Sequence, residues 1–266
     1  MRLVFTLLIM AGGACAQLRD NRTAQLSCND NNYGAGRQRF CEVREQIVPA
    51  VGRLTVDPGK NGGVTVKGWL RNDVSIRTRV ETWAPSVDEA RALAGLVRAD
   101  ASAGQVKTSG PDSQRDSGWS VSYEIFVPQM TDLNMTSFNG GIDLSDVRGR
   151  IEFAAQNGGV RLTRVAGDVR GQTLNGGIQV ELTGRTWEGG QLEASTTNGG
   201  VTLSMPENYS AHIQTGTVNG AIDSDFPISV TVRGRMRPRD LDFSVGSGGP
   251  LIRVSTTNGG VKLRRI

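Results

Sequence analysis

The chain carries few of the side chains that enzymes use for acid–base or metal chemistry. It has a single histidine, His212, and only three cysteines. The common zinc sites combine histidine and cysteine ligands at short spacing, and the sequence has neither a G-x-S-x-G nucleophile motif nor a phosphate-binding loop. We therefore expect His212 to be an ordinary surface residue, and the sequence predicts no catalytic centre, metal site or cofactor.

A groove that degrades polysaccharides would need a row of acidic or basic side chains along one face. One column of recurring positions in the second half of the chain is a candidate, but its members alternate in sign or are neutral. They are Asp143, Arg161, Gln179, Thr202, Asp223 and Lys262. Interspersed charges of this kind are typical of a solvated surface, so we predict that the protein is not an enzyme.

Aromatic residues near arginines form the best candidate for a recognition surface. Such combinations can grip an anionic glycan, a lipid headgroup or a partner protein. The candidate residues are Arg185, Trp187, Tyr209, Arg233, Arg235, Arg237 and Arg239. The competing interpretation is a solvated strand edge, whose arginines prevent pairing with the strands of other chains.

Cys28 and Cys41 are predicted to form a disulfide. In an oxidising compartment two nearby cysteines normally pair, and closing a loop this short stabilises the fold by about 3 kcal/mol. The alternative is a pair of free thiols.

The first 16 residues have the features of a cleaved signal peptide. Arg2 precedes an apolar run at 3–10, and small residues follow up to an A-x-A cleavage pattern at 14–16. The apolar run is shorter than the roughly 20 residues needed to span a bilayer. We therefore expect an exported mature chain without a transmembrane segment, located in the periplasm, at the cell surface or outside the cell. The alternative is lipidation of Cys15, although Gly12 stands where a lipobox normally has leucine.

The composition favours short strands joined by tight turns. The 266 residues include 35 glycines without a Gly-X-Y period, and the net charge of +4 comes from scattered basic residues. This mild, dispersed charge gives no reason to expect nucleic acid as a partner.

An Asn-Gly-Gly sequence recurs through the second half of the chain. Each copy has an apolar residue six positions before the asparagine and another three positions after it. The asparagines are Asn139, Asn157, Asn175, Asn198, Asn219 and Asn258. Asparagine and glycine tolerate sharp turns, and the flanking residues alternate between apolar and polar as in a half-buried strand.

This repeat predicts a mainly β fold, a single-chain β-solenoid with about 18–23 residues per coil over 133–266. Stacked coils would bury an aliphatic column and align the asparagines in a hydrogen-bonded ladder. Three longer segments (183–191, 204–212 and 224–251) occur at the same phase of the repeat, so we expect them on one side of the molecule. The last coil, ending at 262–266, would leave a bare edge that protects itself with arginines or supports self-association.

Residues 43–132 lack this regular spacing and are predicted to form an α+β cap over the first coil, preceded by a disulfide-stapled segment at 17–42. Ser86 and Glu89 form a capping box at the start of a helix over 86–99. The single Asn-Gly-Gly of this region, at 61–63, predicts either a hairpin turn or a divergent copy of the repeat.

The N-G-G-[IV]-x-[LV] copies, a V-x-G step at 147–149 and 165–167, and the strand that ends at Val127-Pro128 resemble the bacterial "putative adhesin" β-strand-repeat family over residues 43–266. Ala221 and Ser224 depart from the pattern in one copy. The resemblance implies an exported protein with a structural or adhesive role at the cell envelope or surface, and no catalytic residues. The alternative is a periplasmic sensor or accessory protein that binds an envelope glycan, lipid or protein.

Overall fold

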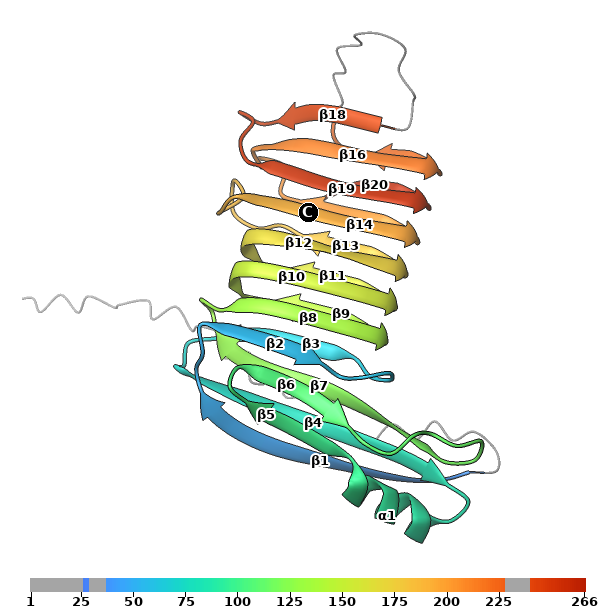
Figure 1. The fold of residues 1–266 in the computed structure, drawn as a ribbon. Helices are drawn as coiled ribbons and strands as arrows, with labels where there is room; N and C mark the ends of the chain where they lie inside the picture. Colours follow the sequence, from blue (N-terminus) through green and yellow to red (C-terminus); the bar gives the residue numbers. More distant parts are fainter. Residues whose placement is uncertain (1–25, 29–36, 228–239) are drawn as a thin grey trace, which may run out of the picture.

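The computed structural model describes residues 26–28, 37–227 and 240–266. The expected signal peptide at 1–16 lies outside these residues. The described chain forms two ten-stranded sheets that face each other and extend along one axis (Figure 1). One helix, α1 (Val87–Leu96), lies at the end of this assembly that contains β1.

We name the sheets after two of their strands. In the β8 sheet, the strands from one edge to the other are β18 (Asp240–Val245), β16 (Ala211–Asn219), β19 (Leu251–Asn258), β14 (Gln191–Asn198), β12 (Ala166–Asn175), β10 (Arg148–Asn157), β8 (Asp132–Asn139), β2 (Arg53–Asp57), β6 (Gln105–Ser109) and β5 (Arg98–Ser102). In the β9 sheet they are β1 (Gln38–Pro49), β4 (Asp73–Ala84), β7 (Gly118–Pro128), β3 (Val64–Trp69), β9 (Ile142–Ser145), β11 (Val160–Thr163), β13 (Ile178–Glu181), β15 (Val201–Met205), β20 (Val261–Arg265) and β17 (Ile222–Ser224).

Each Asn-Gly-Gly copy gives one strand to each sheet. In the second copy, β10 ends at Asn157, the chain crosses at the glycines, and β11 begins at Val160. Neighbouring copies pair in parallel and in register, so that Ile151 lies opposite Leu133 and Val160 opposite Ile142. Because alternate side chains of both sheets point inward, the aliphatic residues of every copy form one continuous core between the sheets.

The prediction of a β-solenoid is wrong. A solenoid stacks its coils in sequence order, whereas here the sixth copy (β19 and β20) lies between the fourth (β14 and β15) and the fifth (β16 and β17). Both sheets are also mixed, with antiparallel pairs at β1–β4, β4–β7, β5–β6 and β16–β18. Strand β18, near the end of the long segment 224–251, pairs with one side of β16, and β19 then pairs with the other side.

The boundary at 132 between a cap and the repeats is also not a structural boundary. β2 and β3 pair with β8 and β9 in the repeat register, with Leu54 opposite Leu133 and Val64 opposite Ile142. Asn61 forms a parallel bridge with Asn139, so Asn61-Gly-Gly is a divergent copy of the repeat rather than a hairpin turn. The remaining N-terminal strands extend the same two sheets.

The helix begins as expected and ends earlier than expected. The Ser86 hydroxyl accepts a hydrogen bond from the Glu89 backbone N–H at 3.2 Å, as in a helix N-cap. The helix ends at Leu96 instead of residue 99, because Arg98 already belongs to β5.

The asparagines form a hydrogen-bonded ladder along the ends of the β8-sheet strands. Each side-chain amide donates Nδ2–H to Oδ1 of the next asparagine, at 2.7–3.0 Å. In spatial order the ladder runs through Asn219, Asn258, Asn198, Asn175, Asn157, Asn139 and Asn61. All six bonds point in the same direction, so each amide polarises the next.

A second row of hydrogen bonds holds the glycines of the same turns. The Thr173 hydroxyl donates to the Gly158 carbonyl at 2.8 Å, and Thr196, Thr217 and Thr256 make the corresponding bonds to Gly176, Gly259 and Gly199 at 2.7–2.8 Å. These threonines are buried, so they stabilise the turns and form no exposed array.

The last strand is internal. β20 lies between β15 and β17, so the expected bare edge at 262–266 does not exist. Arg264 pairs with Asp223 at 2.5 Å and with Asp225 at 3.1 Å, and the bond from Arg264 lowers the pKa of Asp223. The edges at this end of the two sheets are β17 and β18 instead.

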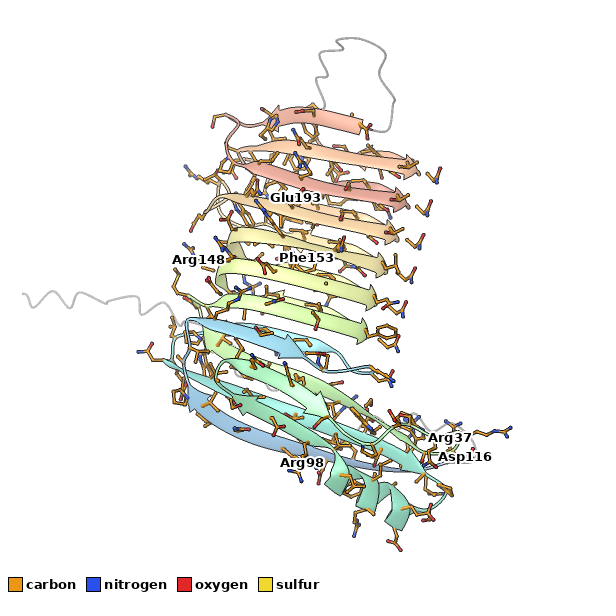
Figure 2. The ribbon with its side chains drawn as sticks, viewed as in Figure 1. Arg37, Arg98, Asp116, Arg148, Phe153 and Glu193 are labelled. Atoms are coloured by element: carbon orange, nitrogen blue, oxygen red, sulfur yellow. A yellow bond between two sulfur atoms is a disulfide. The ribbon has the colours of Figure 1, made fainter. Side chains whose placement is uncertain are left out.

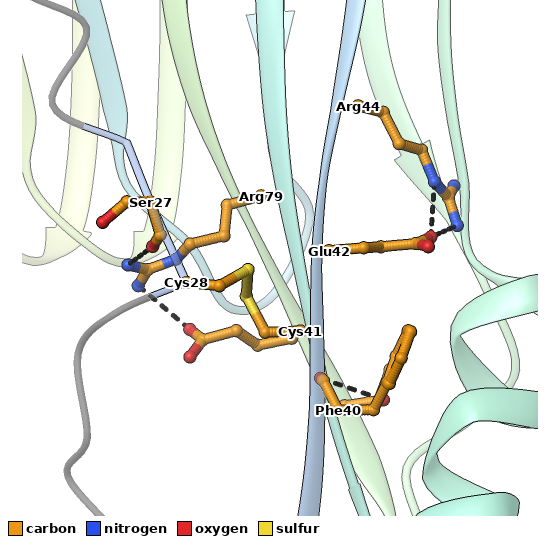
Figure 3. Close-up of a disulfide and its surroundings, with 9 residues drawn as sticks. Ser27, Cys28, Phe40, Cys41, Glu42, Arg44 and Arg79 are labelled. Atoms are coloured by element: carbon orange, nitrogen blue, oxygen red, sulfur yellow. Dashed lines mark hydrogen bonds and ion pairs between the residues drawn. A yellow bond between two sulfur atoms is a disulfide. The ribbon is translucent and has the colours of Figure 1, made fainter.

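The predicted disulfide joins Cys28 to Cys41, with a Cα–Cα distance of 5.7 Å (Figure 3). It fixes residues 26–28 across the outer face of the β9 sheet. There the Arg79 guanidinium donates to the Ser27 carbonyl at 3.1 Å. The carboxylate of Glu124, only 2% exposed, accepts from the Leu26 backbone N–H at 3.4 Å and pairs with Lys67 at 2.9 Å.

Replacing Thr173 with valine keeps the shape of the side chain and removes the hydroxyl that holds Gly158. We expect the free energy of unfolding to fall by about 1 kcal/mol, measured by urea unfolding followed by circular dichroism. Thr215→Val is the matched control, because Thr215 is only 5% exposed and its buried hydroxyl has no hydrogen-bond partner among the described residues. The control should keep the free energy of unfolding of the wild type. Equal stability of the two variants would contradict a role for the row of threonine hydroxyls.

Replacing both Cys28 and Cys41 with serine should lower the free energy of unfolding by about 3 kcal/mol, because the loop between them is no longer closed in the unfolded chain. The same urea titration measures this loss, and wild-type protein unfolded under reducing conditions serves as the comparison. An unchanged unfolding midpoint in both samples would show that the disulfide adds nothing to stability.

Candidate functional site

The predicted recognition residues do not form one exposed cluster. Trp187 is 3% exposed and donates its indole N–H to the Gly167 carbonyl at 2.9 Å, and Tyr209 is 1% exposed. Both rings therefore belong to the core and are unavailable to a partner, contrary to prediction. Arg185 is exposed. Arg233, Arg235, Arg237 and Arg239 lie outside the described residues.

These two aromatic rings are buried because the inserted segments contact each other. Thr186 and Ser210, from the first and second insertions, form a parallel bridge, and the Ser210 backbone N–H donates to the Arg185 carbonyl at 2.7 Å. His212, next to this bridge, contacts Asp242 through Nε2 at 2.9 Å and lies at the surface with a partly exposed side chain.

A trough of about 580 Å³, which was not predicted from the sequence, lies on the outer face of the β8 sheet. Its lining comes from five adjacent strands, β12, β14, β19, β16 and β18. Glu193 of β14, labelled in Figure 2, shows where this part of the sheet lies. Strand β18, which comes from the third insertion, forms one end of the trough.

The strand register places small and polar residues in the middle row of the trough. Gln172 lies opposite Ser195, Ser195 opposite Ser255, Ser255 opposite Gly216, and Gly216 opposite Asp240. The two serines and the glycine make the sheet surface low at the centre of this row. Gln172 and Asp240 are at its two ends.

A hydrogen-bonded chain of charged and amide side chains borders the trough on one side. The Arg253 guanidinium pairs with Glu193 at 3.0 Å and donates to the Gln214 side-chain carbonyl at 2.7 and 2.9 Å. The Gln214 amide in turn donates to the Asp242 carboxylate at 3.2 Å. These bonds hold the polar groups of this border in fixed orientations.

The opposite border is formed by Thr197, Thr257 and Val218, which precede the turn asparagines. Val218 is 56% exposed and gives this border an apolar surface. Leu241 of β18 adds a second aliphatic side chain to the lining. The trough thus combines hydroxyl, amide and carboxylate groups with aliphatic surface.

Charge and backbone pairing limit what this trough can recognise. Its charged lining residues are Arg253, Asp240 and Asp242, which gives a net charge of 1 − 2 = −1. The backbone groups along its floor pair with neighbouring strands. Recognition here therefore depends on side chains, and anionic ligands are not favoured.

In the column of mixed charges on the β9 sheet, Arg161 and Asp143 form an ion pair. Arg161 contacts Asp143 at 3.4 Å and Gln179 at 3.3 Å, with all three side chains exposed or half-exposed. Among the described residues, no three histidine, cysteine, aspartate or glutamate side chains gather in a way that could hold a metal ion.

In the described ranges, no helix has both the length and the apolar character needed to cross a bilayer.

No family model and no curated protein sequence matches this chain. Several solved structures are similar to it. A "putative cell adhesion protein" from Clostridium sporogenes has 10% identity and a TM-score of 0.42, covering 85% of this chain and 100% of that one. A "putative adhesin" from Bacteroides fragilis has 14% identity and a TM-score of 0.40, covering 85% and 97%. A "putative lipid binding protein" from Parabacteroides distasonis has 10% identity and a TM-score of 0.31, covering 84% and 96%.

Proposed function

We propose that this is an exported, non-enzymatic binding protein of the cell envelope or cell surface, which uses the outer face of the β8 sheet to hold an envelope component. The trough is the observation that carries this proposal. Its volume of about 580 Å³ lies within the range of ligand sites, roughly 300–1,000 Å³, and it is surrounded by convergent polar groups.

The side chains of the trough favour binding over catalysis. Nucleophilic catalysis needs a hydroxyl or thiol within reach of an adjacent base that activates it. The serine hydroxyls of the trough floor are flanked by Gln172 and Gly216, neither of which can act as a base. The carboxylates of Glu193 and Asp242 are engaged by Arg253 and Gln214. Such groups can hold a ligand by hydrogen bonds without changing it.

An extracytoplasmic location is supported by two independent features. The first 16 residues have the pattern of a signal peptide. The Cys28–Cys41 disulfide holds residues 26–28 on the β9 sheet, and such bonds persist in oxidising compartments outside the cytoplasm. A structural or adhesive role there agrees with a two-sheet body whose turns are held by asparagine and threonine hydrogen bonds.

Fractionation of cells that produce the full chain tests this proposal. We expect the mature protein, beginning at Gln17 and with Cys28 bound to Cys41, in the periplasmic, surface or culture-medium fraction. Purified mature protein should also sediment with isolated envelope material. Mass spectrometry identifies the N-terminus and the disulfide. An unprocessed, reduced protein in the cytoplasm would overturn the proposal. So would a mature protein that does not sediment with envelope material.

A further inference from the structure

We propose that the trough on the β8 sheet binds an extended, uncharged polysaccharide chain that lies across the strands, from Gln172 towards Asp240. This inference rests on the proposed function and names its ligand class. Four properties of the trough lead to it: its length, its side-chain chemistry, its charge and its fixed geometry.

The length of the trough fits a chain rather than a single small molecule. It crosses five adjacent strands, and strands in a sheet are about 4.8 Å apart, so the outer two strands are separated by roughly 19 Å. The row from Gln172 through Ser195, Ser255 and Gly216 to Asp240 carries hydrogen-bonding side chains on four of the five strands, with Gly216 as the gap. A ligand that uses the whole row must itself be extended.

The side chains match the two surfaces of a sugar ring. Hydroxyls at Ser195 and Ser255 can both donate and accept, as sugar hydroxyls do, and the amides and carboxylates at the ends and along one border add further partners. The aliphatic side chains of Val218 and Leu241 offer a surface for the C–H groups of the rings. An acyl chain would leave the hydroxyls and amides of the floor without partners, which is costly.

Charge and backbone pairing exclude the other common polymers. Nucleic acids and anionic glycans require an excess of arginine and lysine, whereas the lining of the trough has a net charge of −1. A peptide that adds as a strand requires a free sheet edge, whereas Ser195, Ser255 and Gly216 lie on strands that are paired on both sides. An uncharged polysaccharide requires neither an excess of basic residues nor a free sheet edge.

The polar border is ordered before any ligand arrives. Arg253, Gln214 and Asp242 are joined by hydrogen bonds across three strands, and Glu193 fixes the other side of Arg253. Binding therefore orders few additional side chains, which favours recognition by an otherwise weak set of hydrogen bonds.

Calorimetric titration of the mature protein with soluble, uncharged hexasaccharides tests this inference. The probes are cellohexaose, maltohexaose, xylohexaose and chitohexaose, each with its disaccharide, and a heparin hexasaccharide is the anionic comparison. We expect at least one uncharged hexasaccharide to bind, with its disaccharide more than tenfold weaker. No binding of the uncharged set, or tighter binding of heparin, would overturn the inference.

Ser255→Val fills the floor of the trough and should weaken binding of that hexasaccharide more than tenfold. Valine is favoured in strands, so the variant should fold. Ser204→Val is the matched control, because Ser204 points outward from β15 on the other sheet, and it should bind as the wild type does. Equal affinity of all three proteins would overturn the assignment to the trough.

The two proposals can fail separately. A protein that sediments with envelope material equally well before and after Ser255→Val keeps its role as an exported, envelope-binding protein but loses the trough as the binding site. A cytoplasmic, unprocessed protein loses the proposed function whatever its affinity for hexasaccharides.

Discussion

The close approach of backbones at the Asn-Gly-Gly turns is the constraint on which the rest of the structure depends. A Cβ atom on Gly158 would lie 2.0 Å from the Gly140 carbonyl oxygen of the neighbouring copy, so only glycine allows the turns to nest. Nested turns bring successive asparagines within hydrogen-bonding distance and place the threonine hydroxyls over glycine carbonyls. The register of both sheets, and hence their common core, follows from this contact.

The same register arranges the outer surface. Residues at the same position of each copy lie side by side on neighbouring strands. One position of the repeat therefore forms a row that runs across the sheet. The position three residues before the asparagine is occupied by Gln172, Ser195, Gly216 and Ser255 in four copies, and these small or polar residues form the middle of the trough. The repeat register thus determines the floor of the trough, and the inserted strand β18 closes one end of it.

Much of this could be predicted from the sequence, since the turns, the alternation of the strands, the disulfide and the start of the helix all depend on local patterns. The order of the strands could not be predicted, because every copy has a similar strand edge. The length of the segment before β19 decides which copy the sixth one pairs with. The position of Ser195 and Ser255, three residues before the turn asparagine, can be read from the repeat, but the end wall that β18 forms cannot. Trp187 resembled an exposed contact residue, and only its packing against Gly167 places it in the core.

The position of the sixth copy has a consequence for how the chain folds. Among the described residues, the strands of the fifth copy (β16 and β17) do not pair with those of the fourth; their parallel partners are β19 and β20, which come later in the sequence. During synthesis or export, the first four copies can assemble in order, but the fifth has no parallel partner until the sixth has been added to β14 and β15. The edges of β14 and β15 therefore remain unpaired until more than fifty further residues have been added to the chain. During that time the incomplete protein can pair through these edges with another chain.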